Sequence, residues 1–340
     1  MTVRPTSVRR QANRTSATRW FRFRELGLVF FVIVVFAIAT AMQPRFLSPE
    51  NLRNILLYIP LITVVALGEM MVIITRNFDL SVGSILGFSA IVVGNIFIGD
   101  LYFPIWLAAI IGILIGALLG AVNGMLVAWL RIPSVLATLG TLSAYRGLIF
   151  IYSGGRQVDP NYIPPDLIAL SQGSPIYVPW IVIFVVIIAV AIFLFLRYTH
   201  TGRQIYAIGS NPLAANLRGI AVEKVTLLVF ILCGAAAGLA GIMYASRYGY
   251  VNPGDTGVGF ELTVISAAVI GGTNVLGGSG SVLGTVLGCL LLGVINTALF
   301  ILGISGFWQL ATYGLAILVA ITVDTAIQRS LGRRATGGTL

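Results

Sequence analysis

The chain has 340 residues, of which 58% are hydrophobic and only 9% are charged, and its mean hydropathy is +0.98. A soluble domain carries about 25% charged residues, so this composition excludes a soluble fold and indicates a polytopic membrane protein. The formal net charge is +10, and the placement of the basic residues indicates topology more than it indicates a ligand.

The N-terminal segment is strongly basic: residues 1–24 hold seven arginines and no acid, directly before an apolar run. This position favours retention on the cytoplasmic side over nucleic-acid binding. The apolar run lacks a small-residue cleavage site, so we expect a retained helix and no signal peptide. We expect a basic cytoplasmic tail over 1–25, one transmembrane domain over 26–328 and a cytoplasmic tail over 329–340.

Apolar runs near the bilayer-spanning length of about 20 residues recur along the chain. They predict an all-α polytopic membrane fold with about ten transmembrane helices. The expected spans are Leu26–Met42, Ile55–Thr75, Leu80–Ile98, Phe103–Leu130, Pro133–Tyr152, Tyr177–Leu196, Val225–Ser246, Glu261–Gly271, Val282–Gly303 and Phe307–Ile327. An even count places both termini on one side, and the excess of arginine in the segments on that side predicts that it is the cytoplasm.

A polar turn, carrying Asn77, Asp79 and Ser81, separates the second and third expected spans. Asp79 could simply cap the third span, or the turn could gate a solute path. The stretch Asn77–Gly87 also resembles Asn274–Gly284, which is either an internal repeat of the kind common in transporters or a chance match of glycine-rich turns.

A hydroxyl-rich face runs along the fifth expected span, where residues recur at helical spacing. Its members are Ser134, Thr138, Thr141 and Tyr145. Such a face suits a sugar that must leave water, but serine and threonine also make hydrogen bonds between transmembrane helices. Both interpretations stay open.

A polar interruption, Ile208–Val225, lies between two long apolar segments and carries helix start and stop signals. Asn211 can cap a helix and Pro212 suits its first position. Leu213, Ala214 and Leu217 share one face, and Gly219 is placed to end the helix. We expect a short cytoplasmic helix whose apolar face packs either in a partner's groove or on its own protein.

Catalytic and nucleotide-binding signals are sparse. There is no GxxxxGK[ST] motif, and Lys224 is the only lysine. The single histidine, His200, and two distant cysteines, Cys233 and Cys289, offer no metal cluster or catalytic triad. We therefore expect neither an enzyme nor a chain that binds ATP or another cofactor itself.

Four stretches together resemble inner-membrane permease subunits of ABC importers for ribose, xylose, rhamnose and related monosaccharides, a branch that includes the autoinducer-type furanosyl importers. These stretches are "GSNPLAANLRGI", "ITRNFDLSVGSILGFSA", "NGMLVAWLRIPSVLATLGTLSAYRG" and "VIGGTNVLGGSGSVLGTVLG". The resemblance implies a channel-forming subunit driven by a separate cytoplasmic ATPase, where ATP and magnesium would bind. It also implies an extracytoplasmic sugar-binding protein and a second permease copy or paralogue.

The resemblance makes the short helix the ATPase-coupling element. The residues so implied are Asn211, Pro212, Leu213, Ala214, Ala215, Leu217, Arg218 and Gly219. Two other classes stay open: an ion- or proton-coupled carrier for a small polar solute, which would transport without ATP, and a membrane scaffold, which would carry no solute. The sequence does not distinguish a pentose, hexose, deoxyhexose, polyol or furanosyl substrate.

Overall fold

The computed structural model describes residues 8–173 and 178–305, with a few scattered positions between 307 and 322, and side chains from Glu25 onward. This part of the chain forms twelve α-helices and two short 3₁₀ helices. The helices of membrane-spanning length are α1 (Val8–Met42), α2 (Pro49–Ile74), α3 (Val82–Gly99), α4 (Ile105–Ala128), α5 (Ser134–Ser153), α7 (Trp180–Tyr198), α10 (Val222–Tyr248) and α12 (Val282–Ile301). The expected polytopic, helical membrane fold is confirmed.

Shorter helices connect the spans. They are η1 (Pro44–Leu47), η2 (Pro160–Tyr162), α6 (Pro165–Gln172), α8 (His200–Ser210), α9 (Pro212–Leu217) and α11 (Phe260–Ile270). The last of these is the eighth expected span, and its 11 residues are too few to cross a bilayer. The expected span Phe307–Ile327 lies mostly outside the described residues.

Two helix starts differ from expectation. The α1 backbone is helical from Val8, so the first helix extends back into the basic segment that we expected to be a separate tail. The second span begins at Pro49 and not at Ile55, because Ser48 Oγ accepts a hydrogen bond from Asn51 N and Pro49 occupies the first turn.

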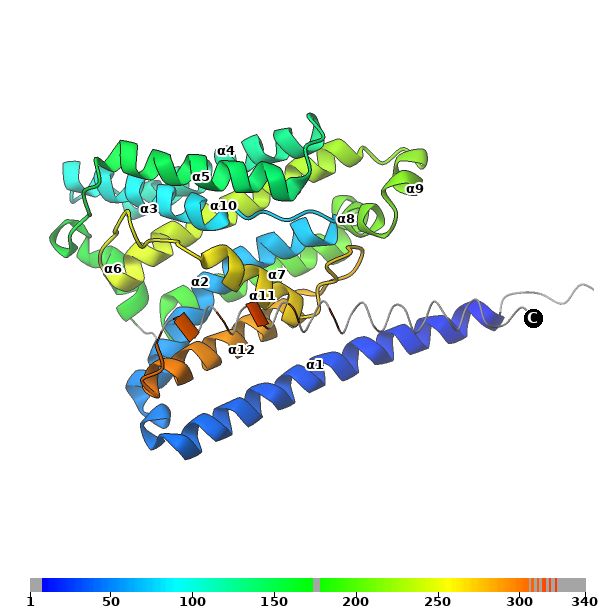
Figure 1. Ribbon diagram of the computed structural model, residues 1–340, viewed down its shortest axis with the longest axis horizontal. Helices are drawn as coiled ribbons and strands as arrows, with labels where there is room; N and C mark the ends of the chain where they lie inside the picture. The colour runs from blue at the N-terminus through cyan, green and yellow to red at the C-terminus, as the bar shows by residue number, and fades with distance from the viewer. Residues whose placement is uncertain are drawn as a thin grey trace, which may run out of the picture.

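The long helices pack in layers (Figure 1). Helices α3, α4, α5 and α10 lie together, α2 and α7 lie next to them, and α1 runs along α12 at the outer edge. Helix α2 is buried along most of its length and supplies much of the core. Helices α8 and α9 lie at one end of the bundle, hereafter the α9 end, and α6 and the α1–α2 connection lie at the other, hereafter the η1 end.

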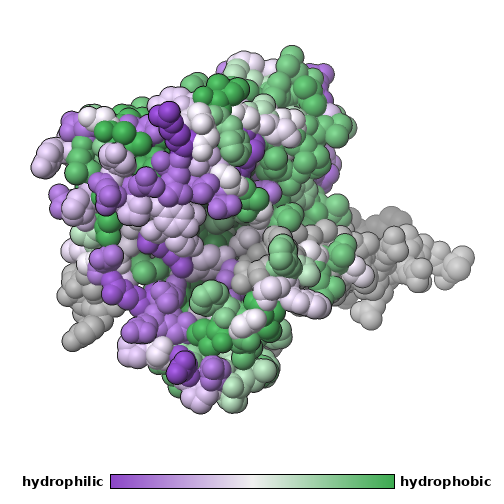
Figure 2. All heavy atoms as spheres, turned by 60° about the vertical axis from the view of Figure 1, so that its left-hand side comes forward, coloured by the Kyte–Doolittle hydropathy of each residue, from purple (hydrophilic) through white to green (hydrophobic). Residues whose placement is uncertain are grey.

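Glycine permits the closest helix contact, between α4 and α10. Gly116 faces Gly234 and Gly238, and a Cβ atom added to Gly116 would overlap the Gly234 carbonyl oxygen. Small residues let transmembrane backbones approach in this way. Hydrophilic residues gather over the η1 end, whereas hydrophobic residues cover much of the adjoining side of the bundle (Figure 2).

Candidate functional site

The short helix expected from the sequence is α9, and its caps form as the sequence indicates. Asn211 Oδ1 accepts a hydrogen bond from Ala214 N at 3.0 Å, and Pro212 occupies the first helical position. Gly219 follows the C-cap residue Arg218 with a φ of 81°, a conformation that favours glycine. A helix of six residues is therefore held at both ends by local contacts.

The apolar face of α9 points away from the rest of the chain. The side chains of Leu213 and Leu217 are 70% and 82% exposed, and Ala214 between them is exposed as well. Only Ala215 is buried against the bundle. Leu213 and Leu217 are four residues apart, so they lie on one side of the helix. Within the described residues, nothing covers this pair.

A second helix, α8, precedes α9 and was not anticipated from the sequence. Thr199 caps it by accepting a hydrogen bond from Gly202 N at 3.0 Å. Its inner face carries Ile205 and Ile208, both buried in the core. The capping threonine and these two isoleucines, three residues apart, were the available signals. The polar interruption is thus the second half of a two-helix connection between α7 and α10.

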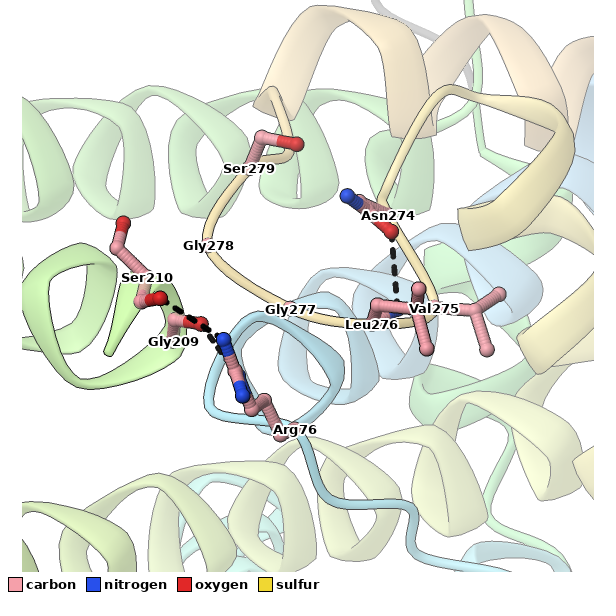
Figure 3. A pocket seen from close by; sticks show the side chains of 9 residues that line it. All are labelled: Arg76, Gly209, Ser210, Asn274, Val275, Leu276, Gly277, Gly278 and Ser279. Atoms are coloured by element: carbon pink, nitrogen blue, oxygen red, sulfur yellow. Dashed lines mark hydrogen bonds between the residues drawn. The ribbon is translucent and has the colours of Figure 1, made fainter. Parts of the chain in front are cut away.

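Arg76 ties the end of α8 to the end of α2 (Figure 3). Its Nε donates to the Gly209 carbonyl at 2.6 Å and its Nη2 donates to the Ser210 carbonyl at 2.8 Å. These carbonyls belong to the last turn of α8, where the helix itself supplies no donors. The backbone of Arg76 has a φ of 67°, a left-handed conformation that residues other than glycine rarely adopt. Its guanidinium therefore links α2 to the residues immediately before α9.

The loop between α11 and α12 meets the same place. Gly278 N donates to the Ile74 carbonyl at 2.9 Å, and a Cβ atom added to Gly209 would overlap that carbonyl. A cavity of about 610 Å³ lies between Arg76, Ser210 and this loop (Figure 3). Tyr206 of α8 donates to the Gly280 carbonyl at 3.0 Å, and burial raises the pKa of this tyrosine. Three segments far apart in sequence are thus joined beside α9.

The polar turn after α2 is buried and its side chains bond to one another. Asp79 Oδ1 accepts from Ser81 N at 2.9 Å and from Ser81 Oγ at 2.7 Å. Asn123 of α4 donates to both oxygens of Asp79, and Glu69 of α2 accepts from Asp79 N. Burial raises the pKa of Asp79, while the hydrogen bonds from Ser81 and Asn123 oppose the shift. Asn77, at the start of the turn, bonds to Thr75.

The expectation that Asp79 caps the third span is wrong. The N-cap residue of α3 is Ser81, and its side chain makes no capping hydrogen bond. Asp79 lies two residues before Ser81, and its carboxyl group accepts hydrogen bonds from Ser81 within the turn. This geometry is the common one for an aspartate that bonds its own backbone two residues on.

The hydroxyl-rich face of α5 points toward this turn. Ser134 Oγ accepts from Phe78 N at 3.1 Å, and Thr138 Oγ1 donates to the Ser134 and Phe78 carbonyls. Tyr145 donates to the Leu119 carbonyl and lies 3.3 Å from Asn123 Oδ1. All four residues of the face are buried, and Thr141 also bonds within α5. The face and the turn, separate in the sequence, form one cluster.

A second cavity, of about 620 Å³, lies between α9 and this cluster. Its lining includes Leu213 and Asn216 together with Arg76 and Asn77. Arg131 and Glu223, also on its wall, form an exposed ion pair at 3.3 Å. The free face of α9 is therefore continuous with a hollow that reaches the connection between α2 and α3.

Comparison with known proteins finds transport permeases, both by family and by individual relatives. The family model described as "Branched-chain amino acid transport system / permease component" matches residues 51–322. The chain is 35% identical over 315 residues to the autoinducer 2 import system permease protein LsrC of Escherichia coli K12, a match that covers 92% of this chain and 91% of the relative. The protein of the same name from Enterobacter sp. strain 638 is 36% identical, over 91% of this chain and 89% of the relative. No solved structure matches the chain.

Proposed function

We propose that this chain, which belongs to the branched-chain amino acid transport system / permease component family, forms the membrane channel of an ATP-driven importer for a monosaccharide or a related small polar solute. Membership makes the chain a multi-pass inner-membrane permease component and not an enzyme. Importers of this kind combine a permease with an ATPase and a solute-binding protein.

The proposed substrate class rests on the relatives. Those described above are named as autoinducer 2 import permeases, and their similarity extends over almost the whole chain. At 35% identity this supports a small polyhydroxylated solute without selecting one. A pentose, a deoxyhexose and a furanosyl compound all fit.

The exposed leucine pair on α9 carries the proposal for the ATPase. Two large apolar side chains on a rigid, capped helix, 70% and 82% exposed, are placed to fill a groove in a partner. In this proposal the ATPase holds ATP and magnesium, Arg218 contacts the rim of its groove, and the α9 end faces the cytoplasm. Both termini then also lie in the cytoplasm, and the binding protein meets the η1 end.

The contacts around Arg76 support a route for the coupling. When the ATPase moves α9, Arg76 transmits the displacement to α2, and the Gly278–Ile74 bond transmits it to the loop before α12. The cluster formed by the turn and the α5 hydroxyl face lies next to this joint. We propose that it borders the solute path, and that a second copy or a paralogue of the permease completes the channel.

The direct test is reconstitution. The chain alone in proteoliposomes should hydrolyse no ATP, and adding its ATPase and loaded binding protein should give ATP-dependent uptake of radiolabelled D-ribose, D-xylose or L-rhamnose. Hydrolysis by the chain alone, or equal uptake without ATP, would contradict the proposal.

A labelling experiment tests the orientation. Ser210→Cys should react with a membrane-impermeant maleimide only from the cytoplasmic side, and Asn161→Cys only from outside. The native Cys233 and Cys289 are both buried, so background labelling should be low. Reaction of both introduced cysteines from the same side would overturn the topology.

A further inference from the structure

A cavity of about 650 Å³ lies at the η1 end, opposite α9, and the contacts described so far do not use it. It is lined by the α1–α2 connection, the first turns of α2, and the last turns of α10 and α12. Its polar lining includes Gln43, Asn51, Asn54, Tyr58, Arg247 and Asn296. Ligand sites in proteins typically measure about 300–1,000 Å³, so the cavity is large enough for a small solute.

Arg247, near the end of α10, is a partly buried charged group in the lining of this cavity. Its guanidinium carbon lies 5.0 Å from the centre of the Tyr58 ring and 4.9 Å from that of Tyr248. Its Nη1 is buried and has no hydrogen-bond partner among the described residues, and in that part of the chain no carboxylate forms an ion pair with it. A buried charged donor without a partner is costly, so the site favours a ligand that accepts its hydrogen bonds.

The groups that hold Arg247 come from three different helices. Asn296 of α12 donates to the Tyr58 hydroxyl of α2 at 2.7 Å, and the Tyr58 ring packs against Arg247 of α10. Asn51 donates to the Phe46 carbonyl at 2.7 Å, which fixes the start of α2 beside them. Hydrogen bonds of this kind hold binding groups in place before the ligand arrives.

The chemistry of the lining suits a polyhydroxylated ligand. Side-chain amides offer both donors and acceptors, and Glu50 stands in the same wall as Arg45. The Glu50 carboxylate offsets one of the two arginine charges of the lining, Arg45 and Arg247, and it accepts hydrogen bonds from hydroxyl groups. The rings of Tyr248 and Phe300 provide apolar surface for the carbon-bound faces of a sugar.

We propose that this cavity is a monosaccharide-binding site at the outer end of the permease, which receives the solute released by the binding protein. The proposal rests on the function proposed above, since it takes the solute class and the orientation from it. Arg247 is the principal hydrogen-bond donor of the site, and the Tyr58 and Tyr248 rings hold its guanidinium in place.

The test uses the complete importer in detergent with a reporter cysteine, Asn54→Cys, on the cavity wall. Its maleimide labelling is followed while D-ribose, D-xylose or L-rhamnose is titrated, and uptake of the same sugars is measured in proteoliposomes. The imported sugar should slow labelling. Adding Arg247→Gln should raise the half-protecting concentration about tenfold or more, because a hydrogen bond from a charged group is lost. Tyr248→Ala, which changes a more exposed residue, should also raise the half-protecting sugar concentration.

The matched control is Arg156→Gln, which removes an exposed arginine outside the cavity lining and should leave protection unchanged. ATP-dependent uptake without protection of the reporter cysteine would overturn the site while the proposed function stands. The same follows if Arg247→Gln and Tyr248→Ala are both protected at the same sugar concentration as the importer with the reporter cysteine alone. Protection without uptake would support the site and overturn the import proposal, and the absence of both would overturn both. Protection by inorganic phosphate in place of the sugars would overturn the assignment to a polyhydroxylated ligand.

Discussion

Helix α9 and the turn Asn77–Ser81 are both short interruptions of apolar sequence at the same end of the bundle, yet they are built in opposite ways. In α9 the large apolar side chains are exposed, whereas in the turn Asp79 and Ser81 are fully buried. A buried polar group is tolerated only when it is hydrogen-bonded, and Asp79 receives its bonds from within the turn and from α4. An exposed apolar pair has no such compensation inside the chain. The turn therefore belongs to the permease core, whereas α9 presents the surface that we propose as an interface.

The largest expected effect comes from opening the buried turn. Asp79→Ala leaves Ser81 N and Ser81 Oγ without their acceptor and removes the bonds from Asn123, which keeps only its bond to Ser81 Oγ. Each buried group so orphaned costs about 1–3 kcal/mol. We expect a stability loss of roughly 3 kcal/mol, visible as a lower melting temperature and reduced monodispersity in detergent. Asp255→Ala makes the same change at an exposed site and should leave both unchanged. Equal melting temperatures for the two variants would mean that the turn is not part of the core.

The next effect concerns the joint between the two regions. Arg76→Ala removes the donors to the Gly209 and Ser210 carbonyls, at a cost of about 1–2 kcal/mol for a partly exposed site. ATPase binding should persist, whereas sugar-stimulated ATP hydrolysis should fall several-fold because α9 no longer moves with α2. Arg131 also has a positive φ at the same end, but its ion pair with Glu223 is exposed. Arg131→Ala should therefore keep normal stimulation, and an equal loss in both variants would exclude a specific role for Arg76.

A smaller effect separates helix shape from helix surface. Asn211→Ala removes the N-cap of α9, which typically costs about 1 kcal/mol. That is enough to fray a helix of six residues and to weaken ATPase association modestly. Ser48→Ala removes the cap of α2, a helix of 26 residues, and should leave ATPase association unchanged. If Asn211→Ala binds the ATPase at full strength, the caps do not maintain the docking surface.

The smallest effect is expected at the α5 hydroxyl face. Thr138→Val is nearly isosteric and removes a hydroxyl bonded to the Ser134 and Phe78 carbonyls, a loss of about 0.5–1 kcal/mol. Assembly should be intact and sugar uptake slower, because the face borders the proposed path. Ser143→Ala removes an exposed hydroxyl of the same helix as a control. Unchanged uptake for Thr138→Val, Thr141→Val and Ser134→Ala would place the path elsewhere.

The same two regions show which structural features could be predicted from the sequence alone. The ends of α9 were predictable because Asn211, Pro212 and Gly219 act on residues within a turn of themselves. Hydropathy predicted the long spans because the apolar residues of each span are also consecutive in the sequence. The cluster around Asp79 was not predictable, because its partners Glu69, Asn123 and Ser134 come from three other helices and one sequence does not indicate which helices pack together. Arg247 and its tyrosines escaped prediction on the same ground.

The central claim, that α9 is the docking element for the ATPase, is tested most directly by co-purification of the ATPase with Leu213→Ala, Leu217→Ala and the double variant. Truncating an apolar anchor in a groove costs about 2 kcal/mol or more, which is roughly thirtyfold in affinity. We predict that each single variant inserts normally but retains much less ATPase, and that the double variant retains almost none. Leu114→Ala, which truncates an exposed leucine in the middle of α4, should retain the ATPase fully. Full ATPase binding and normal sugar-stimulated hydrolysis by the double variant would contradict the claim.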